Sequence, residues 1–305
     1  MLIEPHNSNI YIFGFWADYE HYFFNQYKDI FYELKDVENL YPIMNYFPRF
    51  IKNITYKALI KKKIKTQTNK IFIVNEHRLI LNTINEIIQK DILPGIVLLR
   101  NPMNSRIEPI INSLQNKGVK CFSFDKNDCK KYNFFYYNQF ITFFPELLSE
   151  KPTIDIAFMG QDKNRYQIIK KLTDHLKTEK ISSAVKIIEN NKNTSYYNYL
   201  LFNLQARCIL DINQEGQSGL TLRPLEALFY RRKLITNNIS IINEPFYNSN
   251  NIFIIENMQS LNIKKIKDFL NRDLVEIADS IKEQYTTSYV IHKILTTYSK
   301  NSCQQ

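Results

Sequence analysis

The pattern of apolar and polar residues along the chain predicts strands and helices that alternate in two successive sets. Short apolar runs at residues 9–13 and 155–159 end at Gly14 and Gly160, and a helical pattern follows each of them. An apolar run that is bounded in this way is typical of a buried parallel strand that turns into a loop and a helix. The chain therefore starts an α/β unit twice.

The alternation continues after each start. The elements expected in the first half are a helix at 19–34, a strand at 71–74, a helix at 78–89, a strand at 96–99, a helix at 107–115 and a strand at 119–124. Those expected in the second half are helices at 164–177, 196–204, 222–230 and 263–270 and strands at 185–188, 208–212, 233–236 and 252–255. This order predicts the α/β class, with two doubly wound, Rossmann-like domains.

Two prolines mark the expected connection between the domains. Pro145 and Pro152 flank residues 146–151, which we interpret as the interdomain linker. Residues 288–298 have a helical pattern. The predicted organisation is a first domain at 1–148, a second domain at 149–285 and a C-terminal helix at 286–305 that packs back across the first domain.

Composition narrows the class of protein. The chain has 305 residues, 44% hydrophobic and 14% aromatic, which is enough to bury two cores and excludes a disordered chain. The four cysteines have no C-x-x-C spacing, which excludes a zinc ribbon and favours a reducing compartment. Neither an apolar run of 18 residues nor a signal-peptide pattern occurs, so we expect a cytoplasmic protein.

The net charge of +10 favours an anionic partner, which can be nucleic acid, a bilayer surface or a phosphorylated small molecule. A composition rich in Asn, Lys, Ile and Tyr explains this charge equally well. The dense basic run of Lys61, Lys62, Lys63 and Lys65 either holds the protein peripherally at an anionic inner-membrane leaflet or forms a solvated helix face. No nucleic-acid-binding motif is recognisable, so we expect no nucleic-acid partner.

The loop after the expected strand at 208–212 is the one best suited to bind a phosphate. Its glycines allow close backbone approach, and Thr221 is placed to cap the next helix. Arg223 adds forked N–H donors, and Glu226 lies on the same helical face with a carboxylate that suits ribose hydroxyls. The alternative is an ordinary helix cap with a surface Arg–Glu pair. Asp162 follows the expected strand at 155–159, and we expect it to cap the helix at 164–177.

Three segments of the second half carry a recognisable pattern: IAFMGQDKNR (156–165), CILDINQEGQSGLTLRPLEAL (208–228) and KLITN (233–237). They resemble the C-terminal half of a GT-B glycosyltransferase, in particular the small bacterial enzymes of lipopolysaccharide, O-antigen and capsule assembly. The resemblance implies two domains that face a central cleft, with a nucleotide-sugar donor on the second. The donor-binding residues that it implies are Gly160, Arg165, Gln217, Ser218, Gly219, Leu220, Thr221, Arg223 and Glu226.

The resemblance implies transfer of a sugar from a nucleotide sugar, here a UDP-sugar, to a glycan or glycolipid acceptor such as a lipooligosaccharide core. Many retaining members carry a glutamate eight residues before the one that matches Glu226, and Ser218 stands there, which favours inversion. No Asp-x-Asp motif occurs, so we expect neither a metal nor another cofactor. The alternatives are a nucleotide-sugar 2-epimerase of the same fold and, in another class, a basic nucleic-acid-binding protein with steep salt dependence.

An inverting transfer needs a general base, which we expect in the first domain. Asp18, Glu20 and His21 follow the first strand, and Asp18 is our choice because it is nearest the expected loop tip. Glu76, after the next strand, is the runner-up. A helix cap is the alternative role for Asp18. The residues expected to bind the acceptor lie in the same strand-end loops: Trp16, His77, Arg100, Asn101 and Arg106.

Overall fold

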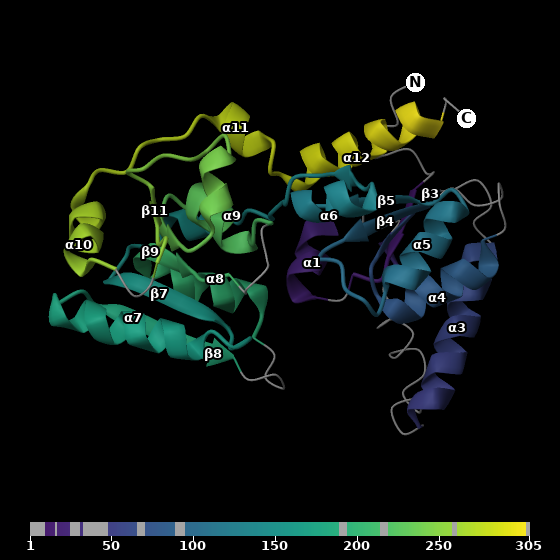
Figure 1. Ribbon diagram of the computed structural model, residues 1–305, viewed down its shortest axis with the longest axis horizontal. Helices are drawn as coiled ribbons and strands as arrows, with labels where there is room; N and C mark the ends of the chain where they lie inside the picture. Colours follow the sequence, from purple (N-terminus) through teal and green to yellow (C-terminus); the bar gives the residue numbers. More distant parts are fainter. Residues whose placement is uncertain are drawn as a thin grey trace. The chain divides into compact units, whose positions relative to one another are not determined.

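The computed structural model describes residues 10–15, 17–24, 31–32, 48–65, 71–88, 95–188, 194–213, 219–257 and 261–302. The chain divides into two compact units (Figure 1). One unit comprises the chain up to Tyr137 together with residues from Val290 onward, and the other is Asn138–Tyr289. This division lies before the boundary predicted at 148, and part of the expected linker forms a 3-10 helix, η3 (Pro145–Ser149), inside the second unit.

The first unit contains a parallel sheet of six described strands in the order β2-β1-β3-β4-β5-β6. The strands are β1 (Ile10–Phe13), β2 (Phe31–Tyr32), β3 (Ile71–Asn75), β4 (Gly95–Leu99), β5 (Lys120–Ser123) and β6 (Phe135–Tyr136). The direction of the strand order reverses between β1 and β3. The carboxyl ends of these two strands therefore form the switch point at which open parallel sheets bind their ligands.

The helices of the first unit pack on this sheet through apolar stripes. They are α1 (Asp18–Phe24), α3 (Arg49–Lys65), α4 (Arg78–Ile87), α5 (Glu108–Asn116), α6 (Lys126–Tyr132) and most of α12 (Thr287–Ser302). Helices α3, α4 and α5 contribute Ile60, Ile84 and Leu114 to one core cluster, where they meet Phe72 and Val97 of the sheet. Figure 1 shows α4 and α5 along this face of the sheet.

The second unit contains a parallel sheet of five described strands in the order β11-β10-β9-β7-β8. The strands are β7 (Ile154–Gln161), β8 (Ser183–Ile188), β9 (Ala206–Asp211), β10 (Lys233–Thr236) and β11 (Ile252–Ile254). Here the order reverses between β7 and β9. The residues that follow these two strands consequently occupy the switch point of the second unit.

Helices cover both faces of the second sheet. They are α7 (Tyr166–Thr178), α8 (Tyr196–Leu204), α9 (Leu222–Phe229), α10 (Ile263–Asn271) and α11 (Asp279–Glu283), with the 3-10 helix η4 (Ile239–Asn243) after β10. Leu172 of α7 and Phe269 of α10 pack in one core cluster with Phe158 and Leu210 of the sheet. Two doubly wound parallel sheets confirm the predicted α/β class.

The structure corrects the sequence prediction at several elements of the first unit. A helix was expected at residues 19–34, but α1 ends at Phe24, and Phe31 and Tyr32 form β2 beside Ile12 and Phe13. Aromatic residues suit a pleated, half-buried surface, so this short strand carries no helical signal of its own. Helices α3 and α6 and strand β6 were not predicted. Within the described ranges, no helix combines the length and the apolar character that a membrane span requires.

Candidate functional site

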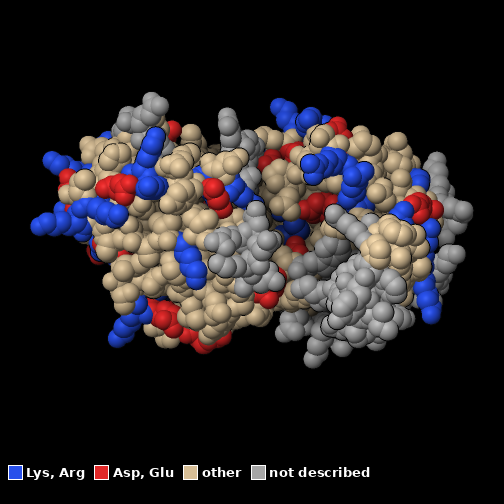
Figure 2. All heavy atoms as spheres, turned by 90° about the horizontal axis from the view of Figure 1, so that it is seen from below, with Lys and Arg blue, Asp and Glu red and all other residues tan. Residues whose placement is uncertain are grey.

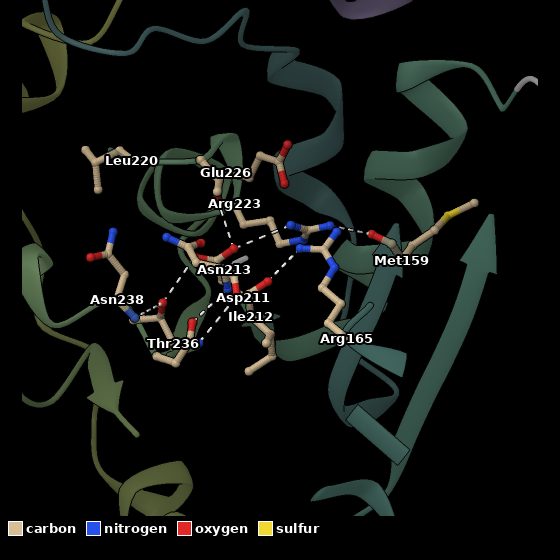
Figure 3. A network of polar contacts seen from close by, with 12 residues as sticks. Met159, Arg165, Asp211, Ile212, Asn213, Leu220, Arg223, Glu226, Thr236 and Asn238 are labelled. Carbon is tan, nitrogen blue, oxygen red and sulfur yellow. Dashed lines mark hydrogen bonds and ion pairs between the residues drawn. The ribbon is translucent and has the colours of Figure 1, made fainter. Parts of the chain in front are cut away.

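Asp211, the last residue of β9, is fully buried and anchors a polar network at the switch point of the second unit (Figure 3). Its Oδ1 accepts a hydrogen bond from Thr221 Oγ1 at 2.9 Å and lies 3.4 Å from Arg223 Nη1. Its Oδ2 accepts a hydrogen bond from Thr236 Oγ1 at 3.1 Å. One carboxylate therefore ties β9 to the end of β10 and to the start of α9.

Thr221 stands directly before α9, but its side chain does not cap the helix as predicted. The reason is that its hydroxyl donates to Asp211 instead. The first N–H groups of an α-helix have no partner inside the helix and usually need one. With no side-chain cap, the start of α9 presents backbone donors and the positive end of the helix dipole to the switch point.

Arg223 lies in the first turn of α9 and links that helix to the sheet. Its Nη2 donates to the carbonyl of Met159 at 2.8 Å, and its guanidinium carbon lies 4.8 Å from the ring centroid of Phe158. The side chain is buried, and no described residue accepts a hydrogen bond from its Nε. The guanidinium group thus bridges β7 and β9 and still retains unused donors.

Arg165, directly before α7, places a second buried guanidinium group at the same switch point. Its Nη1 donates to the carbonyl of Ile212 at 2.6 Å. Its Nε and Nη2 donate to the carbonyl of Gln161 at 3.2 and 3.1 Å. Figure 3 shows the two guanidinium groups next to each other, between Asp211 and Met159. The structure therefore brings together both arginines that the sequence assigns to donor binding.

Gly160 supplies the space in which the two arginines meet. A Cβ atom at this position would lie 2.5 Å from Arg223 Nη2 and 3.3 Å from Arg165 Nη2. Real Cβ atoms essentially never come as close as 2.5 Å to another heavy atom, so only glycine fits without moving Arg223. This close approach explains why a glycine interrupts the apolar run of β7, and it makes Gly160 part of the site.

The turn between β7 and α7 is strained. Lys163 and Asn164 have φ angles of 46° and 64°, in the left-handed region that residues other than glycine rarely adopt. Asp162 Oδ1 holds the turn by accepting from the backbone N–H groups of Arg165 at 3.1 Å and Tyr166 at 2.8 Å. This confirms Asp162 as the residue that satisfies the start of α7. Backbone strain of this kind concentrates at functional sites.

The charges of the switch point do not balance. Of the two buried arginines, Arg223 contacts the buried carboxylate of Asp211, whereas the hydrogen bonds of Arg165 go to backbone carbonyls. Burial, together with the neighbouring Arg223, lowers the pKa of Arg165 to about 10. Burial and the same two arginines also lower the pKa of Lys163. The lowered pKa values of Arg165 and Lys163 mean that an added negative charge would stabilise these two cations.

Asn213 adds an unsatisfied amide to the network. Its backbone N–H donates to Asn237 Oδ1 at 2.7 Å, and its carbonyl accepts from Asn237 Nδ2 at 3.5 Å, so the main chain is held firmly. The side chain is only 7% exposed, and neither its oxygen nor its nitrogen has a partner among the described residues. A buried polar group without a partner costs about 1–3 kcal/mol. A ligand that bound here would supply the missing hydrogen bonds.

Glu226 is not placed where the sequence predicts. Its side chain is fully buried, and its two oxygens accept hydrogen bonds from Tyr196 Oη at 3.2 Å and Tyr199 Oη at 3.0 Å, both on α8. Burial raises the pKa of Glu226 to about 7. The expectation that this carboxylate binds ribose is therefore corrected, because tyrosine hydroxyls already occupy it. A surface Arg–Glu pair is equally excluded, since Arg223 is buried as well.

Some of the other residues that were predicted to bind the donor lie outside the described part of the chain. Gln217 and Ser218 are not among the described residues. Gly219 and Leu220 are buried, and the carbonyl of Leu220 accepts from Gln139 Nε2 at 3.4 Å. Figure 3 shows the Leu220 side chain well apart from the two guanidinium groups.

In the first unit, Glu20 organises the loop after β1. Its Oε2 accepts from the backbone N–H of Ala17 at 3.0 Å, and the Glu20 N–H donates to the carbonyl of Ala17 at 2.8 Å. Glu20 thus makes one of the two hydrogen bonds of a capping box, and Ala17 has no side-chain acceptor for the other. Asp18 is exposed and is the first residue of α1, so it lies inside the helix and not at the position before it, where a cap was expected.

Arg100, directly after β4, joins the loops of the first switch point. Its buried Nε lies 3.7 Å from Glu20 Oε1, and its Nη1 donates to Tyr137 Oη at 3.4 Å. Glu76 Oε2 accepts from the Arg100 backbone N–H at 2.9 Å, and Glu76 Oε1 accepts from Asn101 Nδ2 at 2.6 Å. The cluster thus places Glu20 near the guanidinium group of Arg100 and Glu76 on its backbone N–H. Arg100 was expected to bind an anionic acceptor, but its side chain is buried.

The other first-unit predictions lie around this cluster or outside it. His77 precedes α4 and donates its backbone N–H to Asn75 Oδ1 at 3.1 Å, and burial lowers the pKa of its imidazole to about 4. His21 is half-buried on α1, and Arg106 is exposed in the loop before α5. Trp16 lies outside the described residues. Among the described residues, no group of three or more His, Cys, Asp or Glu is arranged to hold a metal ion.

Sequence reasoning missed Asp211, Asn213, Thr236, Tyr137 and the tyrosines of α8. A signal existed for Asp211, because a carboxylate at a buried position of an apolar strand needs a partner. Thr236 carries the same signal at the end of the neighbouring strand. The tyrosines and Asn213 gave none, since their role depends on which helix covers which strand end.

No protein-family model matches the chain, and no curated protein matches it. The structure is similar to the solved structure of CalG4, the calicheamicin glycosyltransferase, with a TM-score of 0.40 and 9% sequence identity. The similarity covers 92% of this chain and 89% of that chain. The function therefore has to be argued from the residues of the site itself.

Proposed function

We propose that the protein is a glycosyltransferase that binds a nucleotide sugar through its diphosphate at the switch point of the second unit. The observation that carries this proposal is the pair of buried guanidinium groups, Arg165 and Arg223, of which Arg223 contacts the carboxylate of Asp211. A dianionic diphosphate matches the excess of positive charge, and forked guanidinium donors suit phosphate oxygens. The three sequence segments that resemble GT-B glycosyltransferases include these residues.

The same groups suit the departure of the diphosphate. When the bond between the anomeric carbon and the diphosphate oxygen breaks, negative charge grows on that oxygen. Fixed donors in a buried site stabilise such charge without reorganising. Arg165, Arg223 and the uncapped start of α9 are held in this way by the strand-end carbonyls and Asp211. The amide of Asn213 would bind a further polar group of the donor.

The proposed reaction is an inverting displacement. An acceptor hydroxyl oxygen attacks the anomeric carbon, the nucleoside diphosphate leaves, and a carboxylate of the first unit takes the hydroxyl proton. Asp18 remains our choice for this base, because it is exposed at the start of α1, the helix that follows β1. The donor proposed is a UDP-sugar, and no metal takes part.

We further propose that the acceptor is a surface-glycan intermediate, such as a lipooligosaccharide core or a lipid-linked glycan. The basis is the sequence resemblance to enzymes of lipopolysaccharide, O-antigen and capsule assembly. Acceptors of this kind are amphiphilic, so the proposed location is the cytoplasm at the inner face of the membrane.

The donor proposal is tested by calorimetry with UDP and a panel of UDP-sugars. Arg165→Lys keeps the charge but removes the fork, and the affinity is expected to fall at least about tenfold. Arg232→Lys is the matched control, because Arg232 is equally buried and likewise donates to carbonyls, those of Leu204, Tyr230 and Glu150. It lies outside the network of Figure 3.

The proposal fails if no nucleotide sugar binds or is hydrolysed, or if both lysine variants lose affinity equally. A gel-shift experiment run in parallel tests the nucleic-acid alternative. Nucleic-acid binding that falls steeply with salt, without nucleotide-sugar binding, would favour that alternative.

A further inference from the structure

Helix α3 (Arg49–Lys65) presents a face that points away from the core of its unit. Ile60 anchors the helix in the apolar cluster and is 1% exposed. Phe50 and Ile54, by contrast, are each 64% exposed, more than any other large hydrophobic side chain that the structure describes. Two large apolar side chains one helical turn apart form a continuous strip, which is unusual on a surface that meets only water.

The strip continues into basic residues along the same helix. Phe50, Ile54, Ala58 and Lys62 recur every four residues, and all four are exposed. We name these four residues the α3 face. Over a rise of 1.5 Å per residue they extend for about 18 Å. The face is therefore apolar at the amino end of α3 and basic at its carboxyl end.

The charge of α3 is of one sign only. The helix has seven Lys and Arg residues among 17 and no Asp or Glu. The nearest acidic partner is Glu86 of α4, which Lys57 Nζ and Lys61 Nζ approach at 2.7 and 3.0 Å. These two ion pairs orient the helix on the unit and leave Lys62 pointing outward.

We propose that the α3 face docks on the surface of an anionic phospholipid bilayer. Phe50 and Ile54 enter the boundary between headgroups and acyl chains, and Lys62 faces the lipid phosphates. This inference rests on the membrane location given under the proposed function and deepens it by naming the residues that bind the bilayer, whichever sugar is transferred.

A bilayer fits this face better than a nucleic acid does. Nucleic-acid backbones are bound by cations and hydrogen-bond donors, whereas the aliphatic side chain of Ile54 gains only from an apolar environment. On the face of the molecule that Figure 2 draws, Lys and Arg side chains are scattered among acidic ones. On that face the positive charge does not gather into the single band that a nucleic-acid backbone would follow. The distinguishing feature of α3 is that apolar and basic residues adjoin.

The test is co-sedimentation of the full chain with phosphatidylcholine vesicles, with and without phosphatidylglycerol. Wild type is expected to bind the anionic vesicles and to be partly released by salt. Phe50→Ser/Ile54→Ser is expected to weaken binding at least about tenfold, since two exposed apolar side chains lose their burial in lipid. Lys62→Glu is expected to weaken binding at least several-fold, because it replaces a positive charge near the anionic surface by a negative one.

Matched controls separate this face from general properties of the chain. Ile239→Ser/Ile242→Ser removes two side chains of similar exposure, 58% and 54%, from η4. Lys170→Glu makes the same charge change at an exposed site on α7. Both controls should bind vesicles like wild type, and thermal unfolding should show that all variants are folded.

Several outcomes would overturn the proposal: no binding of wild type to anionic vesicles, unchanged binding of Phe50→Ser/Ile54→Ser, or equal loss in the controls. Equal binding to heparin or duplex DNA, insensitive to the serine substitutions, would show that the charge alone acts. Failure here is distinguishable from failure of the transferase proposal, because UDP affinity is measured without lipid. Loss of vesicle binding with intact UDP affinity in the α3 variants supports the docking face.

Discussion

Glu226→Gln is expected to change how the stability of the second unit depends on pH. The Glu226 carboxylate is fully buried between Tyr196 and Tyr199, and burial raises its pKa from 4.5 to about 7. A raised carboxyl pKa means that the folded protein holds a proton that the unfolded chain has already lost. This proton stabilises the fold fully below about pH 4.5, and its contribution falls as the pH rises towards 7.

The size of the effect follows from the pKa difference. One pKa unit corresponds to 1.36 kcal/mol, so the shift at Glu226 amounts to about 3 kcal/mol of stability that wild type loses between about pH 4.5 and pH 7.5. Glutamine has almost the same shape and does not titrate. Its amide oxygen accepts a hydrogen bond from one tyrosine hydroxyl, but the other hydroxyl must turn to accept from the amide N–H. This costs about 1 kcal/mol at every pH. The free energy of unfolding of the variant is therefore expected to rise relative to that of wild type as the pH rises.

The measurement is urea unfolding of both proteins from about pH 5 to about pH 8, with amide hydrogen exchange in β9 and α9 to report the second unit alone. Glu244→Gln is the matched control, because Glu244 also accepts from a tyrosine, Tyr285 at 2.8 Å, but is only half-buried. If the stability difference between Glu226→Gln and wild type is the same at all pH values, the raised pKa of Glu226 is refuted. A loss of UDP affinity in a stable Glu226→Gln would restore the ribose-binding role.

Three further predictions test the proposed reaction. Gly160→Ala is expected to weaken UDP binding about tenfold, since its Cβ would lie 2.5 Å from Arg223 Nη2. Gly95→Ala, whose Cβ would meet nothing nearer than 3.9 Å, should bind UDP normally in the same calorimetry, and equal affinities would refute the crowding argument. Sugar transfer should persist in EDTA, and a loss that magnesium or manganese restores would contradict the metal-free proposal. Asp18→Asn should lower kcat by about 10²–10⁴-fold with little change in stability, because Asp18 is exposed, and full activity would exclude it as the base.

The parts of the fold that could be predicted from the sequence are those with a strong local pattern. The apolar runs that became β3 and β7 are buried strands, and their short length favours a strand over a helix. Helix α3 was missed because lysines fill most of its surface, so only a few apolar residues mark its buried side. Strand β2 was missed because it has two residues, and it is defined by pairing with β1 rather than by its own composition.

The site was predictable only as far as strand ends determine it. Gly160 is the next-to-last residue of β7, and Arg165 follows this strand directly before α7. Topology alone therefore brings both residues to the switch point. Arg223 and Glu226 lie one turn apart, which the helical period predicts. The period does not reveal that α8 covers Glu226 with two tyrosines, whereas Arg223 turns to Asp211. That difference depends on tertiary packing, which local patterns do not contain.

The two polar clusters differ in charge, and this difference is what a displacement at a sugar carbon requires. In the second unit, the cluster contains the two buried guanidinium groups of Arg165 and Arg223, of which Arg223 contacts Asp211, so it favours a group that gains negative charge. In the first unit, Glu20 lies near the guanidinium group of Arg100, Glu76 accepts from the Arg100 backbone N–H, and Asp18 is exposed at the start of α1. A carboxylate excess favours taking up a proton, and a guanidinium excess favours releasing an anion. Transfer from a nucleotide sugar needs both steps, whereas binding of a nucleic acid needs only cations. The charge asymmetry between the clusters therefore favours the transferase over the nucleic-acid alternative.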